Sequence, residues 1–113
     1  MNILMILKAV AALATAAVGV LALVKPTAVY DFTGIVASGP RGISEIRAIF
    51  GGLFIALGIA PLFLGAPGYR MLGIGYLVIA VTRAFSIVFD QSYAQSNIIS
   101  LVIEIVFGIL LVI

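Results

Sequence analysis

The chain has 113 residues, of which 65% are hydrophobic and 9% charged, and its formal net charge is +2. A mean hydropathy of +1.38 is too high for a soluble domain of this length, because one small core cannot bury so much apolar surface. The charges are spread along the sequence and form no nucleic-acid patch, and without Cys or His the chain has no disulfide, thiolate, imidazole base or ordinary zinc or haem ligand. We expect an integral membrane protein with no cofactor and no nucleic-acid partner.

Four apolar segments are long enough to cross a lipid bilayer, which requires about 20 apolar residues. They cover approximately residues 3–24, 45–66, 69–89 and 97–113. The second is expected to begin at Glu45 after an N-cap at Ser44. The predicted fold is all-α: a single four-helix transmembrane domain over residues 1–113, with both termini on the same side of the membrane. The Lys and Arg residues divide too evenly to fix the orientation.

The first connection, from Lys25 to Ser44, is long for so small a protein. It contains apolar and aromatic residues, among them Tyr30 and Phe32. Two interpretations stay open: a connector anchored at the membrane interface by its aromatic residues, or a segment that folds back over the bundle as a lid.

Small residues recur at helical spacing in the first two spans and predict faces where helices approach closely. In the first span they are Ala9, Ala12, Ala16 and Gly19; in the second they are Gly52, Ala56 and Ala60. One of these faces could instead serve a homodimer.

Two charged residues stand inside the last two spans at matching depths. Arg83 precedes Asp90 by seven residues, and Glu104 follows Asn97 by seven. At a rise of about 1.5 Å per residue, antiparallel helices place both charges roughly 10 Å below the same membrane surface. Ionisable residues at such a depth usually face a bundle interior or a water-filled cavity, so an ion pair between Arg83 and Glu104 is predicted.

Polar residues accompany this pair on the same side of the bundle. Asn97, Ser100, Glu104 and Gly108 follow one another in steps of three, four and four, which is a single helix face. The second span adds Glu45 and Arg47 near its start, and Asp90 ends the third. We predict one polar cluster, with these candidate ligand-binding residues: Arg47, Arg83, Glu104, Glu45, Asn97 and Ser100.

The run from Ser44 to Gly52, SEIRAIFGG, resembles the signature of a bacterial group of small four-helix membrane proteins known as domain of unknown function 4345. The later Arg83-Ala84-Phe85-Ser86, Asp90 and the acid Glu104 are similar to the second half of that family. The sequence departs from the pattern at Phe50, where the family would lead one to expect a tyrosine. The resemblance implies a four-helix architecture and no particular activity. We expect the chain to be a multi-pass protein of the cell membrane, in a bacterium the inner membrane.

Three functions remain open from the sequence. The polar cluster could neutralise itself and fix helix register, or it could bind or conduct a small anionic or zwitterionic solute. Alternatively, the chain could be an accessory subunit of a larger membrane complex. An enzyme is not expected, because no nucleophile motif accompanies the few carboxylates, Tyr and Lys.

Overall fold

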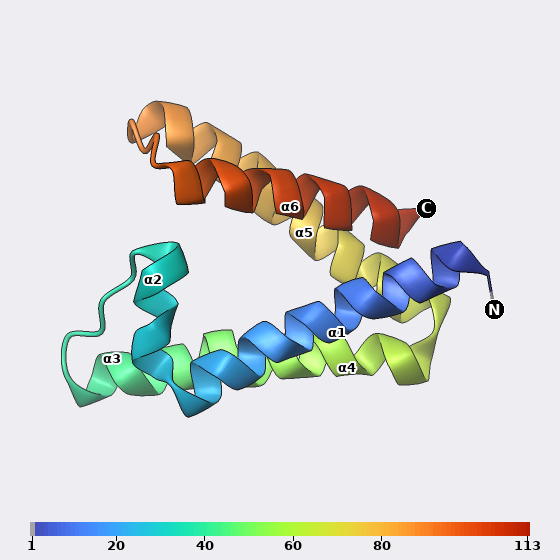
Figure 1. The fold of residues 1–113 in the computed structure, drawn as a ribbon, viewed down its shortest axis with the longest axis horizontal. Coiled ribbons are helices and arrows are strands. Elements are labelled where there is room, and N and C mark those ends of the chain that lie inside the picture. The colour runs from blue at the N-terminus through green and yellow to red at the C-terminus, as the bar shows by residue number, and fades with distance from the viewer. Residues whose placement is uncertain (1) are drawn as a thin grey trace.

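The structure is a computed structural model that describes residues 2–113, and all the regular secondary structure in this part of the chain is helical, without strands (Figure 1). Its elements, in chain order, are α1 (Ile3–Val24), η1 (Pro26–Val29), α2 (Tyr30–Thr33), α3 (Pro40–Glu45), η2 (Ile46–Leu53), α4 (Phe54–Leu64), α5 (Ala66–Phe89) and α6 (Gln95–Val112). The elements α3, η2 and α4 follow one another without a break and form one long helix, Pro40–Leu64.

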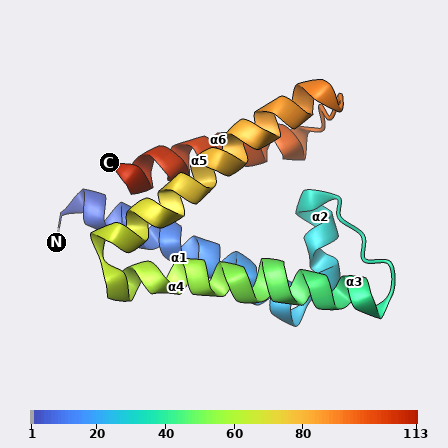
Figure 2. The same ribbon diagram turned by 180° about the vertical axis from the view of Figure 1, so that it is seen from behind.

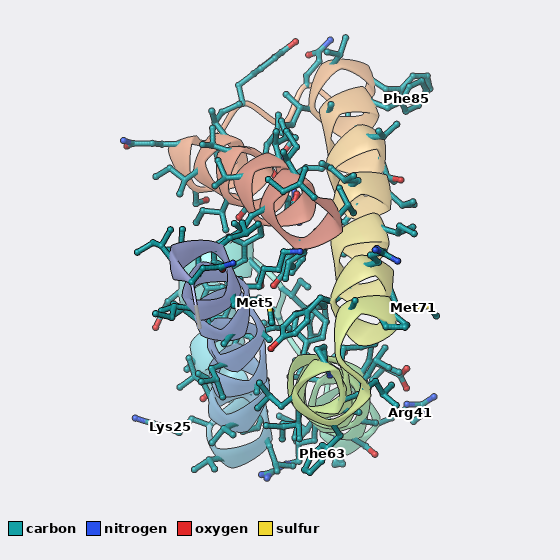
Figure 3. All side chains as sticks on the ribbon, turned by 90° about the vertical axis from the view of Figure 1, so that its right-hand side faces the viewer. Met5, Lys25, Arg41, Phe63, Met71 and Phe85 are labelled. Carbon is teal, nitrogen blue, oxygen red and sulfur yellow. The ribbon has the colours of Figure 1, made fainter. Side chains whose placement is uncertain are left out.

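Four helices in residues 2–113 are long and apolar enough to cross a membrane: α1, the long helix Pro40–Leu64, α5 and α6. Large apolar side chains on their outer surfaces are exposed, as Figure 3 shows for Phe63, Met71 and Phe85. Such a surface suits lipid rather than water. The predicted fold class is confirmed, and both termini lie at the same end of the molecule (Figure 1). The architecture is consistent with a multi-pass membrane protein.

The second helix begins earlier than expected. It starts at Pro40 rather than Glu45, and Gly39, with φ of +87°, precedes it. Proline suits the first turn of a helix because its fixed φ is already helical and its missing N–H would have no helical partner there. Ser44 and Glu45 therefore lie inside the helix, and Ser44 does not cap it.

The four helices are arranged as two antiparallel pairs. One pair is α1 with Pro40–Leu64, and the other is α5 with α6. Figures 1 and 2 show the pairs meeting near the termini and diverging towards the other end. A small core at the meeting end joins them, in which Ala11 and Ala12 of α1 pack with Tyr69 and Leu72 of α5 and Leu111 of α6.

Close backbone contact holds the first pair together. A methyl group added at Gly58 would lie 2.5 Å from the Ala12 carbonyl oxygen and the Ala16 nitrogen, and one at Gly19 would lie 2.8 Å from the Gly51 oxygen. The predicted small-residue face of α1 is thus a packing face, buried within the chain. On the second helix the prediction was wrong: Gly51 and Gly58 face α1, whereas Gly52 and Ala56 are exposed.

The segment Ile46–Leu53, labelled η2, is a π-helix rather than an α-helix. A π-helix has wider turns, so side chains after it fall on different faces from those that regular α-helical spacing predicts. Phe50 lies within η2, and its ring contacts that of Phe54 with the centroids 5.8 Å apart.

The first connection folds back towards the second helix pair. Val29 is buried against Ala22 of α1 and Ile46 of η2, which fixes the base of this segment. From there α2 extends towards α6, and Figure 1 shows it in the region where the helix pairs diverge. It ends at Gly34, which has the left-handed φ of +76°. The connection thus reaches α6, while its aromatic residues Tyr30 and Phe32 stay exposed, so anchoring at a membrane interface remains a prediction.

Candidate functional site

Arg83 and Glu104 form the predicted ion pair, joining α5 to α6. Arg83 Nε donates to Glu104 Oε1 at 2.8 Å, and its Nη2 donates to Oε2 at 2.7 Å. This two-point geometry is the strong form of an Arg–carboxylate contact. The Glu104 side chain is only 10% exposed, whereas that of Arg83 is 33% exposed. The pair therefore presents its positive member to the surroundings.

Asn97 fixes the other end of the Arg83 guanidinium. Arg83 Nη1 donates to Asn97 Oδ1 at 2.9 Å. The Asn97 amide nitrogen in turn donates to the backbone oxygen of Ser92 at 3.1 Å and to its hydroxyl at 2.9 Å. These contacts orient the amide so that its oxygen points at the arginine.

The turn between α5 and α6 positions Ser92 for this role. The Ser92 N–H donates to the Ile87 carbonyl at 3.0 Å, and the Gln91 N–H donates to the Val88 carbonyl at 3.4 Å. Gln91 has φ of +53°. This is the pattern of the Schellman motif, in which a left-handed residue ends a helix and satisfies its last carbonyls.

An open groove of about 690 Å³ lies beside the pair, where the two helix pairs diverge. Its walls come from α5, α6, η2 and the end of α2. They include Arg83, Asn97 and Ser100, the hydroxyl residues Thr33, Thr82, Ser86, Ser92 and Ser96, and the aromatic residues Phe32 and Phe50. This volume lies in the range of about 300–1,000 Å³ that is usual for ligand sites.

Hydrogen-bond donors outnumber carboxylates in this groove. Arg83 is the one charged residue among those that line it, and none of them is acidic. A guanidinium has five N–H groups. Glu104 and Asn97 engage one on each nitrogen, so two remain on the Nη atoms. The hydroxyls of Ser96 and Ser100 make no hydrogen bond within residues 2–113. The groove is therefore suited to an anionic group.

The sequence model of the family described as "Domain of unknown function (DUF4345)" matches residues 3–113, essentially the whole chain. The chain belongs to the DUF4345 family. No curated protein and no solved structure matches it. The family carries no assigned activity, so the function of this DUF4345 protein has to be argued from its own site.

Two predicted members of the cluster lie elsewhere in this DUF4345 protein. Glu45 accepts a hydrogen bond from Arg41 at 2.5 Å, and both side chains are exposed. Arg47 Nη1 donates to the Leu23 carbonyl oxygen at 2.6 Å. That carbonyl is in the last turn of α1, where a helix has unsatisfied acceptors and attracts cations. The expected single cluster is corrected: Arg83, Glu104, Asn97 and Ser100 share one region, and Glu45 and Arg47 do not belong to it.

Asp90 also has a local partner. It accepts a hydrogen bond from the Ser86 hydroxyl, one helical turn earlier, at 2.6 Å. Its carboxylate is thereby engaged at the end of α5, and Asp90 does not line the groove.

A second polar contact crosses between the helix pairs, and little in the sequence predicts it. Thr15 of α1 and Tyr76 of α5 lie with their hydroxyl oxygens 2.5 Å apart. Because the Thr15 hydroxyl donates to the Ala11 carbonyl, Tyr76 is the donor in this contact. The Tyr76 ring also meets Phe107 of α6 edge-on, with centroids 5.5 Å apart. The available signal was Thr15 itself, a hydroxyl residue among the small residues of the first span.

Proposed function

We propose that this DUF4345 protein binds a molecule with an anionic or zwitterionic head, carboxylate or phosphate, in the groove at Arg83. One observation carries the proposal: the guanidinium lies on the wall of a groove of about 690 Å³ with two N–H groups left over, and no acidic residue lines that groove.

The ion pair alone has a limited structural role. It joins α5 to α6, which already pack closely, since a methyl group added at Gly108 would lie 2.5 Å from Leu77 Cδ2. The pair does not link the two helix pairs. A charge placed at a helix centre in a membrane costs about 2.5–3.5 kcal/mol. Close packing already holds α5 against α6, so helix packing does not require a charge at this position. A role in binding explains why the protein keeps the charge despite its insertion cost.

In this proposal Glu104 preorganises the binding site. It holds Nε and Nη2 of Arg83 and fixes the plane of the guanidinium, while Asn97 holds Nη1. The remaining N–H groups are therefore oriented before a ligand arrives, which lowers the entropy lost on binding. The pair is neutral overall, so a zwitterion meets no net repulsion. The proposal is one of binding without catalysis.

The test is direct titration of the purified protein with methyl phosphate and with acetate, which carry a head group and almost no tail. Both Arg83 and Glu104 should be changed to Gln, because a single change would leave a buried charge without a partner. We expect this double variant to lose affinity at least about tenfold, the effect of removing one good charged contact. Arg41→Gln is the matched control, because Arg41 is 81% exposed and lies outside the groove. Equal affinity of the wild type and the double variant would overturn the proposal.

A further inference from the structure

A second cavity adjoins the groove. It has a volume of about 180 Å³ and is lined by Thr15, Phe54, Leu57, Met71, Leu72, Gly75, Tyr76 and Ile79. Ile79 lines both cavities. The ring contact between Phe50 and Phe54 joins a wall of the groove to a wall of the second cavity. The two cavities therefore follow one another along α5.

The second cavity is apolar. Its two hydroxyl groups, those of Thr15 and Tyr76, are hydrogen-bonded to each other, so neither needs a hydrogen bond from a ligand. An apolar protein cavity of about 150 Å³ stays dry and takes up benzene. The space here accommodates several methylene groups and offers nothing to a polar solute.

The cavity also reaches the outer surface of α5. Met71 lines it and is 71% exposed, and Figure 3 shows this residue on the outer side of α5. Hydrocarbon can thus enter from the bilayer. The distance along α5 from Arg83 to Met71 is roughly 18 Å at the helical rise. A molecule that spans this distance has an extended shape, as an alkyl chain has, whereas a compact solute does not reach so far.

We infer that the ligand is an amphiphile with one alkyl chain, its anionic head at Arg83 and its chain passing Ile79 into the cavity beside Gly75 and Tyr76. This inference rests on the proposed function, since it assigns the tail of the molecule whose head the groove binds. Hydroxyl groups and the guanidinium contact the head, and Phe54, Leu57 and Leu72 contact the chain.

The experiment compares methyl, butyl and octyl phosphate as ligands, in a sterol-based nonionic detergent that has no alkyl chain to compete. Burial of each methylene group is expected to raise affinity up to about fourfold. Octyl phosphate should bind the wild type at least about tenfold more tightly than methyl phosphate.

Gly75→Phe tests where the chain lies. A Cβ added at Gly75 meets no atom within 4 Å, so a larger side chain can enter the cavity without disturbing the backbone. In this variant the advantage of the octyl chain should disappear, while the affinity for methyl phosphate should stay within about twofold. Ile74→Phe is the matched control, because Ile74 is 57% exposed and lines neither cavity. If Gly75→Phe does not fold, Ile79→Trp narrows the passage between the cavities instead.

The outcomes separate the two proposals. If methyl phosphate fails to bind the wild type, the proposed function itself fails. If methyl phosphate binds but longer chains gain nothing, only the amphiphile inference fails. A chain-length gain that survives in Gly75→Phe, or in Ile79→Trp where that variant is used, also contradicts the inference, because the chain would then lie elsewhere.

Discussion

Arg83 of α5 and Glu104 of α6 meet in a two-point ion pair, with N–O distances of 2.8 and 2.7 Å, inside two helices that are otherwise almost wholly apolar. The pair shields its carboxylate and presents its guanidinium to an open groove. An arginine held in this way has a fixed orientation and retains donors for a ligand. The guanidinium is therefore oriented by contacts from α6 alone, within one helix pair.

Removing one partner of the pair should cost stability, because it leaves the other polar group without its partner even though the pair as a whole contributes little. Removing one partner of a buried pair costs about 3–5 kcal/mol, and we expect the lower end because Arg83 is 33% exposed. Glu104→Gln should reduce the free energy of unfolding by roughly 3 kcal/mol in detergent, measured by chemical denaturation. The exchange of Arg83→Glu with Glu104→Arg should recover part of this loss. Single variants that are as stable as the wild type would show that the contact carries no energy.

The close contact between α1 and α4 should make Gly58 intolerant of even a methyl group. In Gly58→Ala the new Cβ would press on backbone atoms of Ala12 and Ala16, which cannot move aside as a flexible side chain can. Overpacking of this kind costs about 1–3 kcal/mol. Gly52→Ala is the matched control: its Cβ would meet only the Arg47 oxygen at 3.9 Å. Thermal unfolding should therefore show a loss for Gly58→Ala and none for Gly52→Ala; similar melting temperatures would contradict this packing.

Substitution of Arg47 should lower the stability of the protein without changing its affinity for methyl phosphate. Its guanidinium binds the Leu23 carbonyl at the end of α1, so Arg47→Gln should cost about 0.5–1.5 kcal/mol, the worth of one hydrogen bond with a favourable helix-end charge. The affinity for methyl phosphate should not change, because Arg47 does not line the groove. A loss of affinity comparable to that of the Arg83 and Glu104 double variant would show that Arg47 does contribute to ligand binding.

The contact between Thr15 and Tyr76 should respond unequally to its two possible deletions. In Tyr76→Phe the Thr15 hydroxyl keeps its bond to Ala11, so the cost should be about 0.5–1.5 kcal/mol. In Thr15→Val the partly buried Tyr76 hydroxyl loses its acceptor, and the cost should rise to about 1–3 kcal/mol. Denaturation of both variants measures the difference. Equal costs, or a larger cost for Tyr76→Phe, would mean that the donor assignment is reversed.

Much of the fold was predictable because the relevant signals are local. Hydropathy marked the four helices, and equal residue counts from the polar turn put Arg83 and Glu104 at the same depth. Asn97 and Ser100 followed from helical spacing, since they share a face with Glu104. These features depend only on the helical repeat and on the antiparallel direction of neighbouring helices.

The positions of Arg47 and Glu45 depended on packing that the sequence did not fix. Arg47 shares its face with Gly51 and Gly58, and these glycines turn that face towards α1 rather than towards α5 and α6. The glycines were visible in the sequence, but their partner helix was not. Glu45 forms a salt bridge with Arg41 instead, because the helix begins at Pro40 and places the two residues one turn apart.

The groove itself could not have been predicted from the helix count. It exists because the two helix pairs diverge, and the divergence follows from where close contacts are made. A core at the shared end, around Tyr69 and Leu111, joins the pairs, whereas towards the opposite end it is the short helix α2 that reaches across to α6. Hydropathy has no information about this difference, which is set by the three-dimensional arrangement of contacts.

Binding of an anionic group at Arg83 can be measured at the residue itself by NMR of the arginine side chains labelled with ¹⁵N. The chain has four arginines, at positions 41, 47, 70 and 83, and the Arg83 signal can be assigned from its absence in the double Gln variant. On titration with methyl phosphate, we expect a saturable shift of the Arg83 side-chain signals while those of Arg41, Arg47 and Arg70 stay unchanged. Unchanged Arg83 signals at saturating ligand, or equal shifts of all four arginines, would contradict it.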